Sequence, residues 1–426
     1  MKITGGNVKL RGEITVPGDK SISHRAVMFG AIAEDDTIIK NFLMGNDCLS
    51  TVQCFRDLGV EIDIQDNIVK VKGVGLKGLK RPKKILNVGN SGTTIRLLSG
   101  ILAGQNFISH ITGDDSIQKR PMDRIITPLR KMGASIKGVD DKYAPLQIEP
   151  ADNLKGITYR QPVASAQVKS CIMLAGLYAD GITRVIQPSI SRDHTERMLN
   201  YFEYDVVIKG KHVILNKTTK LKGKEIIVPG DISSAAFFIV GALILKGSRI
   251  VIKQVGLNPT RTGVIDALKK MGGNIKIVNY RFVNNEPIGD IFVEYSQLKG
   301  IEISGDLIPR LIDEIPVLAV AASVAEGTTI IRNAEELKVK ESNRITAVVN
   351  ELKKMNVDIE ELDDGMIIKG SKNIQTANLD TYKDHRITMA LTILALYAKG
   401  ESIINNTESV SISFPKFYEV LGEIIT

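Results

Sequence analysis

The 426-residue sequence has no tryptophan, 5% aromatic residues and three cysteines. So few rings leave little surface on which nucleic-acid bases could stack. The thiols of Cys48, Cys54 and Cys171 form neither a disulfide framework nor a metal-ligand spacing, and such cysteine usage is typical of a reducing cytoplasm. Because neither H-E-x-x-H nor G-x-S-x-G occurs, we expect no metal ion and no nucleophilic serine triad.

Long hydrophobic runs are also missing. The longest uncharged apolar stretch, residues 235–245, stops at Lys246, well short of the roughly 20 residues that a membrane-spanning helix needs. We interpret it as a buried core helix. The first residues, MKITGGNVKLRGE, contain no apolar segment that would direct the chain to secretion. We therefore expect a cytoplasmic protein without a membrane partner.

Acidic residues are outnumbered: 56 lysine and arginine residues stand against 48 aspartate and glutamate residues, a formal net charge of +8. Either a nucleic acid or a small, highly charged anionic substrate would suit this excess. The basic residues are spread along the chain and aromatic residues are scarce. The charge therefore favours a cleft for small anions, in which converging lysines and arginines offset the charge of the substrate.

The chain does contain an internal repeat. VPGDKSIS begins at Val16 and VPGDISSA at Val228, 212 residues later. Four further segments share the wider pattern of a polar or small helix start, a small-residue apolar helix, then glycine and a strand. These segments begin at Ser91, Ser165, Leu311 and Asp384. Six units of roughly 70 residues account for nearly the whole chain.

The repeat predicts an α/β fold in two domains. A helix that is apolar on all sides must be buried all round, so three units would pack around a shared helical core with their sheets outside. We expect residues 1–19 and 228–426 to form one domain, residues 20–227 the other, and a hinge near 18–20 and 227–229. The N-terminal strand should pair within the first domain. Substrate should bind where the domains meet, and closure would exclude water.

Two predicted helix starts have residue types that suit phosphate. PGDKSISHRA places Lys20, Ser21 and Arg25 at the start of the first apolar helix, where free N–H groups and the helix dipole favour an anion. NSGTTIR places Gly92 at the start of the next, where a missing side chain lets a ligand approach the backbone. Ordinary helix capping is the alternative for both.

Three other segments give weaker signals, and capping and surface charge are the simpler explanation of the first two. VASAQVKS supplies Ser165 and Gln167 at another helix start, and SISRDH adds Arg192 after a strand. QKRPMDR offers Arg120 and Arg124 around a proline, in a rigid loop able to present a guanidinium to a carboxylate or phosphate.

LIDEIP places two acidic residues, Asp313 and Glu314, inside an otherwise apolar helical segment. A buried carboxylate without a partner is costly or has a shifted pKa. Such a carboxylate is a candidate general base.

Two charged clusters follow in the C-terminal part of the chain. VKESNR brings together Lys340, Glu341 and Arg344. KDHR places Asp384, His385 and Arg386 at the head of the last apolar helix. Salt bridges on a solvated face would also explain both clusters.

Taken together and in order, PGDKSISHRA, NSGTTIR, QKRPMDR, PVASAQVKS, LIDEIPVLAV, KVKESNR and KDHRITMA resemble the 5-enolpyruvylshikimate-3-phosphate (EPSP) synthases. The resemblance covers about the whole chain. It implies a two-domain inverse α/β barrel, each domain with three βαβαββ repeats and buried helices. It also implies a transferase of the shikimate pathway of aromatic amino acid biosynthesis, which moves the enolpyruvyl group of phosphoenolpyruvate to the 5-hydroxyl of shikimate 3-phosphate and releases phosphate.

The resemblance implies residues for both substrates. Shikimate 3-phosphate is expected at Lys20, Ser21, Arg25, Ser165, Gln167, Ser191, Arg192, Asp313 and Lys340. Phosphoenolpyruvate is expected at Lys20, Gly92, Arg120, Gln167, Arg344 and Arg386. SISRDHTERM resembles the class II pattern of the family, and Glu336 and Ala166 agree with it. Ile412 stands where some relatives carry a lysine.

In the implied reaction, Asp313 takes the proton of the 5-hydroxyl and Glu341 protonates the methylene carbon of phosphoenolpyruvate. Lys20 protonates or neutralises the departing phosphate, and His385 supports the proton network. The reaction needs neither a metal nor a cofactor. A monomer is expected, and Gly92 implies sensitivity to the inhibitor glyphosate.

Two alternatives stay open at the level of sequence. The related transferase that acts on UDP-N-acetylglucosamine shares the fold but usually carries a catalytic cysteine in the loop that here reads DDSIQKRPMDR, and this chain has no cysteine between Cys54 and Cys171. The basic charge would also suit a nucleic-acid binder or an RNA 3′-phosphate cyclase built from a related repeat.

Overall fold

The computed structural model describes residues 1–216 and 220–426, and the chain forms two compact units. Unit 1 comprises Met1–Pro17, Pro229–Phe282 and Pro287–Thr426. Unit 2 comprises Gly18–Val228 and the short segment Val283–Glu286. None of the helices within the described residues is both long and apolar enough to cross a membrane.

Unit 2 is built from helices and three four-stranded sheets, with strand orders β14-β3-β5-β4, β6-β7-β9-β8 and β10-β11-β13-β12. Its helices are α1 (Lys20–Ile32), α2 (Asn46–Asp57), α3 (Gly92–Leu102), α4 (Asp115–Lys119), α5 (Asp123–Lys131), α6 (Ala166–Gly176) and α7 (His194–Tyr201). Its strands are β3 (Thr37–Lys40), β4 (Ile62–Gln65), β5 (Ile68–Val71), β6 (Leu86–Asn87), β7 (Ser109–Thr112), β8 (Ser135–Val139), β9 (Tyr143–Glu149), β10 (Thr158–Arg160), β11 (Thr183–Ile186), β12 (Val206–Lys209), β13 (His212–Leu215) and β14 (Glu225–Ile227).

Unit 1 has two four-stranded sheets, β16-β17-β15-β2 and β18-β19-β21-β20, and one three-stranded sheet, β1-β23-β22. Its strands are β1 (Lys2–Gly5), β2 (Arg11–Thr15), β15 (Arg249–Gly256), β16 (Asn274–Val283), β17 (Glu286–Glu294), β18 (Glu302–Ile303), β19 (Thr328–Ile331), β20 (Asp358–Leu362), β21 (Gly365–Lys369), β22 (Asn378–Leu379) and β23 (Gly400–Ile404).

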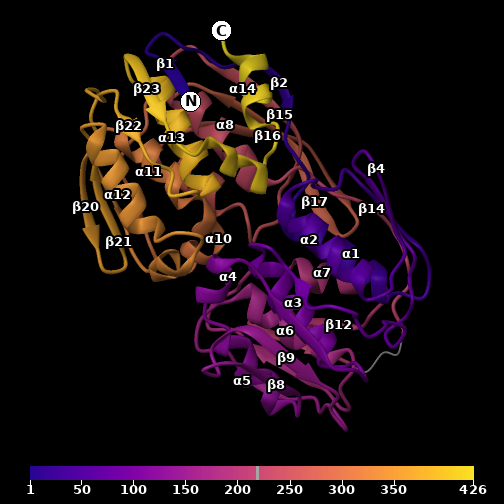
Figure 1. The fold of residues 1–426 in the computed structure, drawn as a ribbon. Coiled ribbons are helices and arrows are strands. Elements are labelled where there is room, and N and C mark those ends of the chain that lie inside the picture. The colour runs from indigo at the N-terminus through magenta and orange to yellow at the C-terminus, as the bar shows by residue number, and fades with distance from the viewer. Residues whose placement is uncertain (217–219) are drawn as a thin grey trace. The chain divides into compact units, whose positions relative to one another are not determined.

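Unit 1 contains α-helices, most of which Figure 1 labels, and four short 3-10 turns. The α-helices are α8 (Ile232–Ile244), α9 (Gly263–Lys270), α10 (Ile308–Leu311), α11 (Ile315–Ser323), α12 (Arg344–Lys354), α13 (His385–Tyr397) and α14 (Phe417–Ile424). The 3-10 turns are η1 (Gly305–Leu307), η2 (Ile312–Glu314), η3 (Glu335–Val339) and η4 (Thr407–Ile412).

The predicted repeat is visible in the strand pairing. In a complete copy such as β6-α3-β7, the strand before the buried helix pairs in parallel with the strand after it, and a hairpin then adds two antiparallel strands. The sixth copy has no such hairpin, and β1 instead completes its sheet by pairing antiparallel with β23. Strand β2 pairs with β15. Both N-terminal strands therefore pair with strands from the C-terminal part of the chain.

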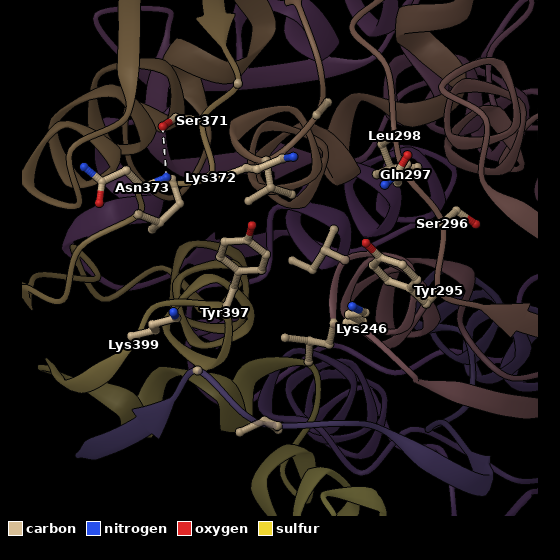
Figure 2. Close-up of a pocket in the computed structure, with 18 of the residues that line it drawn as sticks. Lys246, Tyr295, Ser296, Gln297, Leu298, Ser371, Lys372, Asn373, Tyr397 and Lys399 are labelled. Atoms are coloured by element: carbon tan, nitrogen blue, oxygen red, sulfur yellow. Dashed lines mark hydrogen bonds between the residues drawn. The ribbon is translucent and has the colours of Figure 1, made fainter.

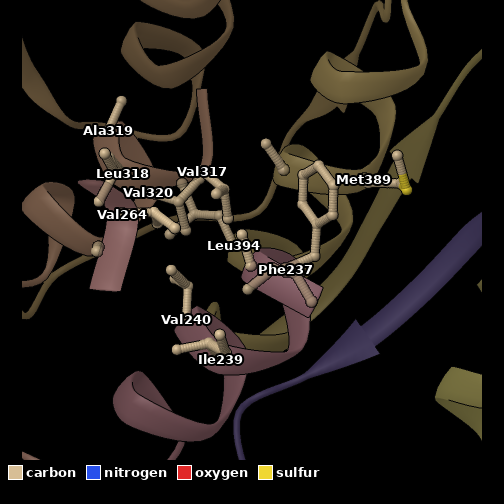
Figure 3. Packing of buried hydrophobic residues seen from close by; sticks show 14 of the residues in the cluster. Phe237, Ile239, Val240, Val264, Val317, Leu318, Ala319, Val320, Met389 and Leu394 are labelled. Atoms are coloured by element: carbon tan, nitrogen blue, oxygen red, sulfur yellow. The ribbon is translucent and has the colours of Figure 1, made fainter. Parts of the chain in front are cut away.

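The buried helices form the core of each unit. Every residue of α8 is buried, including the stretch 235–245 up to its last helical residue, as the sequence predicted. Residues of α8, α11 and α13 pack against one another in unit 1, where Figure 3 shows Phe237 and Val240 facing Val317 and Leu394. A helix without an exposed face needs apolar side chains on all sides, which is what these segments supply.

The two copies of the VPGD motif each provide the N-cap of a buried helix. Asp19 and Asp231 are the N-caps of α1 and α8, and each side chain accepts a hydrogen bond from a backbone N–H of its helix. Several predicted site residues, among them Lys20, Gln167 and Arg386, stand in the first turns of the buried helices α1, α6 and α13, while most of the remainder of these helices is apolar. The fold therefore places candidate binding residues at the N-terminal ends of the core helices in each unit.

Candidate active site

In unit 1, the candidate site is organised around the guanidinium of Arg344, at the start of α12. This side chain is buried and donates hydrogen bonds to three carboxylates: Asp384 at 2.8 Å, Glu341 at 2.6 Å and Asp313 at 3.3 Å. The three acidic residues come from segments far apart in the sequence. One cation thus gathers the predicted base, the predicted acid and the N-cap residue of α13.

Burial opposes the charge on Arg344, but the carboxylates of Asp384, Glu341 and Asp313 outweigh it and raise the pKa above its ordinary value. Burial alone would likewise raise the pKa of Asp384, yet the adjacent Arg344 guanidinium brings that pKa below its usual value. Both groups are therefore charged at neutral pH, and the pair is a fixed ionic support for the cluster.

Two more cations face Asp313. Lys340 Nζ lies 3.6 Å from its Oδ1, and Arg386 Nη2 lies 3.9 Å from its Oδ2. These residues were predicted to contact substrate, and the fold brings them to one carboxylate. His385, at the first position of α13, is buried with its Nδ1 4.0 Å from Asp384 Oδ1. All the predicted site residues of unit 1 therefore lie in one connected cluster.

Glu314, next to Asp313, connects the starts of three core helices. It is buried, accepts a hydrogen bond from Ser233 at the start of α8, and lies 3.9 Å from Arg386 Nη1 on α13. Ser233 Oγ in turn accepts a hydrogen bond from Arg261 at 2.7 Å. The second oxygen of Glu314, Oε2, has no hydrogen-bond partner among the described residues.

In unit 2, the start of α1 carries Lys20, Ser21 and Arg25. Lys20 Nζ forms an ion pair with Asp47 at 2.8 Å. Arg25 is buried and donates to the Ser21 carbonyl at 2.9 Å and to hydroxyls of α6 and α7, and burial lowers its pKa to about 10. Arg25 therefore orders the backbone at Ser21, while Lys20 is partly exposed.

The start of α3 adjoins the start of α6 and the loop after α4. Arg120, in that loop, donates to Asn90 Oδ1 at 2.8 Å. A Cβ on Gly92 would lie 3.2 Å from Arg120 Nη1, so the missing side chain is what lets this guanidinium approach the helix start. Gln167 on α6 donates to Thr93 Oγ1 at 3.1 Å and accepts from Arg96 at 2.5 Å.

The remaining predicted residues of unit 2 lie at α6 and in the loop before α7. Ser165 is the N-cap of α6 and accepts a hydrogen bond from the Val168 N–H. Ser191 and Arg192 lie between β11 and α7, and Ser191 Oγ donates to Gln187 Oε1 at 2.6 Å. These contacts fix the loop that presents Arg192.

The family model for EPSP synthase (3-phosphoshikimate 1-carboxyvinyltransferase) matches residues 4–421. The chain belongs to the EPSP synthase family. It therefore transfers the enolpyruvyl group of phosphoenolpyruvate to the 5-hydroxyl of shikimate 3-phosphate and releases phosphate, a step of the shikimate pathway. The family is therefore neither that of the transferase acting on UDP-N-acetylglucosamine nor that of the RNA 3′-phosphate cyclases.

The EPSP synthase relatives are similar along almost their whole length. The 3-phosphoshikimate 1-carboxyvinyltransferase of Bacillus cytotoxicus is 57% identical over 416 residues, which are 97% of this chain and 98% of the relative. That of Thermoanaerobacter sp. is 56% identical over 410 residues, 96% of each chain. The EPSP synthase structure from Acinetobacter baumannii is 48% identical, has a TM-score of 0.89 and covers 100% of this chain and 98% of its own. The predicted fold class is confirmed.

Several residues of this EPSP synthase that support the site were not predicted. Lys169 and Glu196 form an ion pair of 2.6 Å and are almost completely buried, beside Ser191. Arg96 contacts Gln167, and Asp47 contacts Lys20. One indication of the Lys169–Glu196 pair is present in the sequence. Lys169 lies inside the apolar segment VKSCIMLAG, and a buried cation requires a partner. The identity of that partner depends on tertiary contacts.

Proposed function

We propose that Asp313 and Glu341 are the general base and the general acid of the enolpyruvyl transfer. The observation that carries this proposal is their shared contact with the buried guanidinium of Arg344, at 3.3 and 2.6 Å. Two carboxylates at one rigid cation are held in a fixed geometry, as proton transfer at neighbouring atoms of one reaction requires.

The proposed reaction proceeds by addition and then elimination. The 5-hydroxyl oxygen of shikimate 3-phosphate attacks C2 of phosphoenolpyruvate as Asp313 takes the hydroxyl proton and Glu341 gives a proton to C3. The tetrahedral intermediate then loses phosphate, a proton leaves C3 again, and the double bond is restored. Lys20 neutralises the departing phosphate, and His385 supports the proton network through Asp384, to which it is adjacent.

For shikimate 3-phosphate, we assign Lys20, Ser21, Arg25, Ser165, Gln167, Ser191, Arg192, Asp313 and Lys340. The support from unit 2 is that Ser21, Ser165 and Gln167 stand at starts of core helices, where N–H groups and helix dipoles favour a phosphate. Arg25 is buried and donates to the Ser21 carbonyl, so it would also order the helix start to which the phosphate is assigned.

For phosphoenolpyruvate, we assign Lys20, Gly92, Arg120, Gln167, Arg344 and Arg386. Arginine suits a ligand with one carboxylate and one phosphate because its planar fork can donate two hydrogen bonds to either group. Arg344 already contacts three carboxylates, so the ligand would share that guanidinium with them. Because Gly92 has no side chain, the Arg120 and Arg96 guanidiniums lie close to this helix start, and glyphosate would bind beside them.

We further propose that the enzyme is of class II, acts as a monomer and works in the cytoplasm. The class rests on SISRDHTERM and on Glu336 and Ala166. Three buried free thiols are compatible with a reducing compartment.

Phosphate release is the direct test of substrate choice. The purified protein is incubated with phosphoenolpyruvate and either shikimate 3-phosphate, UDP-N-acetylglucosamine or no acceptor. Release with shikimate 3-phosphate alone is expected. Release with UDP-N-acetylglucosamine would contradict the assigned acceptor.

The role of Asp313 is tested by Asp313→Ala. We expect kcat to fall by about 10² or more while binding of both substrates stays measurable, because the variant loses the proton acceptor but keeps the other residues assigned to each substrate. Asp358→Ala, at an exposed position on β20, is the matched control and should keep normal turnover. Normal turnover of Asp313→Ala would remove Asp313 as the base.

A further inference from the structure

A large cavity lies in unit 1 at the C-terminal ends of the core helices. Its volume is about 1560 Å³, and it is lined by residues that follow α8 and α11 and by the end of α13, together with segments 6–9, 295–298 and 370–376. The cavity is larger than the ~300–1,000 Å³ typical of small-molecule sites, so an extended ligand would fit. Figure 2 shows its lining residues.

This cavity is separate from the candidate active site. The residues of that site in unit 1 stand at the N-terminal ends of the core helices, whereas the cavity is at their other ends. Helices α8 and α13 have 13 residues each. At about 1.5 Å per residue they place the two locations about 20 Å apart. A ligand in the cavity would not contact the reacting atoms.

The repeat provides an internal comparison for this end of the unit. In unit 2, the loop after β5 crosses the ends of the core helices: Val74 N–H donates to Ala31 O at 3.0 Å, and Gln105 donates to Leu76 O at 3.2 Å. The ring of Tyr178 fills the space over Gly104. The same architecture can therefore be packed at this end, and the open cavity of unit 1 is not an unavoidable result of the fold.

The charge of the cavity has one dominant sign. Lys9, Lys246, Lys372 and Lys399 line it, and Glu326 is its one carboxylate. None of the four lysines has an ion-pair partner within the described residues of the chain. Lysines just after α8 and α13 also offset the negative ends of those helices, but Lys9 and Lys372 follow no helix. The excess positive charge is thus available to an anion.

Two tyrosines add flat walls to the cavity. Figure 2 shows the rings of Tyr295 and Tyr397 across the cavity from each other, with Lys246, Lys372 and Lys399 around them. Burial, and then the neighbouring Tyr295, raise the pKa of Tyr397, which agrees with hydroxyls that share one space. Aromatic faces stack on planar rings, while lysine ammonium groups act as point charges toward phosphates.

We propose that this cavity binds a nucleoside polyphosphate, with the phosphates at the four lysines and the base against Tyr295 and Tyr397. Four unpaired cations against one carboxylate match a tri- or tetra-anion better than a monoanion. The absence of arginine from the cavity lining favours a chain of phosphates over the forked recognition of a single carboxylate. The inference does not depend on the residue roles proposed for the active site.

Isothermal titration of the full chain with ATP, without added metal, tests this proposal. We expect a Kd below about 1 mM, weakened about tenfold or more in Lys372→Gln/Lys399→Gln, because each charge-assisted hydrogen bond to a phosphate contributes appreciably. The matched control is Lys269→Gln/Lys270→Gln, which removes two exposed lysines at the end of α9 outside the cavity. Both double variants should keep normal EPSP synthase turnover without ATP, which shows that they are folded.

The outcomes separate the possible sources of binding. No binding of ATP, or equal binding by the wild-type chain and both double variants, would overturn the proposal. Inorganic triphosphate serves as the ringless probe. If it binds as tightly as ATP, and Tyr397→Leu changes neither affinity, the assigned base contact is wrong. If Tyr397→Leu weakens the binding of ATP but not of triphosphate, the assigned base contact is supported.

Discussion

At the scale of single residues, the fully buried cations are the main exception to apolar packing. Arg344 and Lys169 are both within the interior, and each is held by carboxylates that were themselves removed from water. Removing one partner of such a pair leaves an uncompensated buried charge, which costs about 3–5 kcal/mol. Substitutions that preserve shape but change charge are therefore the informative ones here.

Glu314→Gln should raise KM for phosphoenolpyruvate about tenfold and leave KM for shikimate 3-phosphate within about twofold. Glu314 lies 3.9 Å from Arg386 and is held by Ser233, so loss of its charge releases the arginine assigned to phosphoenolpyruvate. A tenfold change corresponds to about 1.4 kcal/mol. Steady-state kinetics with each substrate varied in turn provide the measurement.

Ser233→Ala is the companion variant, because it removes the hydroxyl that links Arg261 to Glu314 and leaves the carboxylate charge intact. It should raise KM for phosphoenolpyruvate less than Glu314→Gln. An equal rise in both KM values, or a fall in kcat alone, would contradict a positioning role for Glu314.

His24 should make the stability of the protein depend on pH. It is completely buried, and burial, followed by the charges of Lys20 and Arg25, lowers its pKa well below 6.5. Below about pH 6.5 the unfolded chain therefore takes up a proton at His24 that the folded chain does not. The stability of the folded chain that depends on neutral His24 is fully present above pH 6.5 and is lost as the pH falls. Between pH 7.5 and 5.5 we expect a loss of about 1.4 kcal/mol from this residue.

The measurement is urea unfolding of the wild-type protein and of His24→Gln at both pH values. The variant can still contact Thr51, which lies 2.7 Å from His24 Nδ1, but it cannot take up the proton. Its loss of stability over this interval should be smaller by about 1.4 kcal/mol. Equal losses in the two proteins would remove His24 as the cause.

At the scale of elements, the close approach of helices α3 and α6 depends on one glycine. A Cβ on Gly100 would lie 2.3 Å from the Cys171 carbonyl oxygen, which is backbone and cannot rotate away. The helix start of α3 and the helix start of α6 carry assigned substrate residues. The distance between these helices therefore sets the geometry of the site in unit 2.

Gly100→Ala should destabilise the protein by about 1–2 kcal/mol. Alanine favours a helix by about 1 kcal/mol over glycine, but overpacking against a fixed backbone costs about 1–3 kcal/mol or more. Urea unfolding is the measurement. Gly422→Ala on α14 is the matched control, since nothing lies within 4 Å of its Cβ position, and it should be neutral or stabilising by up to about 1 kcal/mol. Stabilisation by both substitutions would contradict the prediction, because it would show that α3 and α6 can move apart at little cost.

At the scale of the whole molecule, the chain passes from one unit to the other directly after β2 and again directly after β14. Strand β2 pairs with β15 in unit 1 but leads into α1 of unit 2, whereas β14 pairs with β3 in unit 2 but leads into α8 of unit 1. As a result, residues 18–228 include every strand of the three sheets of unit 2. Residues 229–426 lack both β1 and β2.

The fragment 18–228 should therefore fold cooperatively when expressed alone, and the fragment 229–426 should aggregate. Without β1 and β2, the edges of β15 and β23 are unpaired, and unpaired edges promote association. Thermal unfolding by circular dichroism and size-exclusion chromatography are the measurements. Adding residues 1–17 after Thr426 through a flexible linker of about 12 residues should restore solubility to the second fragment. Aggregation of 18–228 would contradict this account.

The sequence alone determined the family, the α/β class, the apolar core helices and the polar residues at their starts. These features are local: an all-apolar helix requires burial, and a capping aspartate in each VPGD motif satisfies free N–H groups wherever the helix lies. The seven motifs, in their order along the chain, identified the family and with it the two substrates.

Tertiary structure alone decided which charges meet. That Arg344 also holds Asp313 and Asp384, and that Glu314 joins Ser233 to Arg386, depends on contacts between residues tens of positions apart. An acidic residue in an apolar segment indicates a buried carboxylate that needs a partner, but the sequence does not identify the cation that pairs with it. The lysine-lined cavity also depends on tertiary structure. It exists because the C-terminal ends of α8, α11 and α13 are not covered by other parts of unit 1.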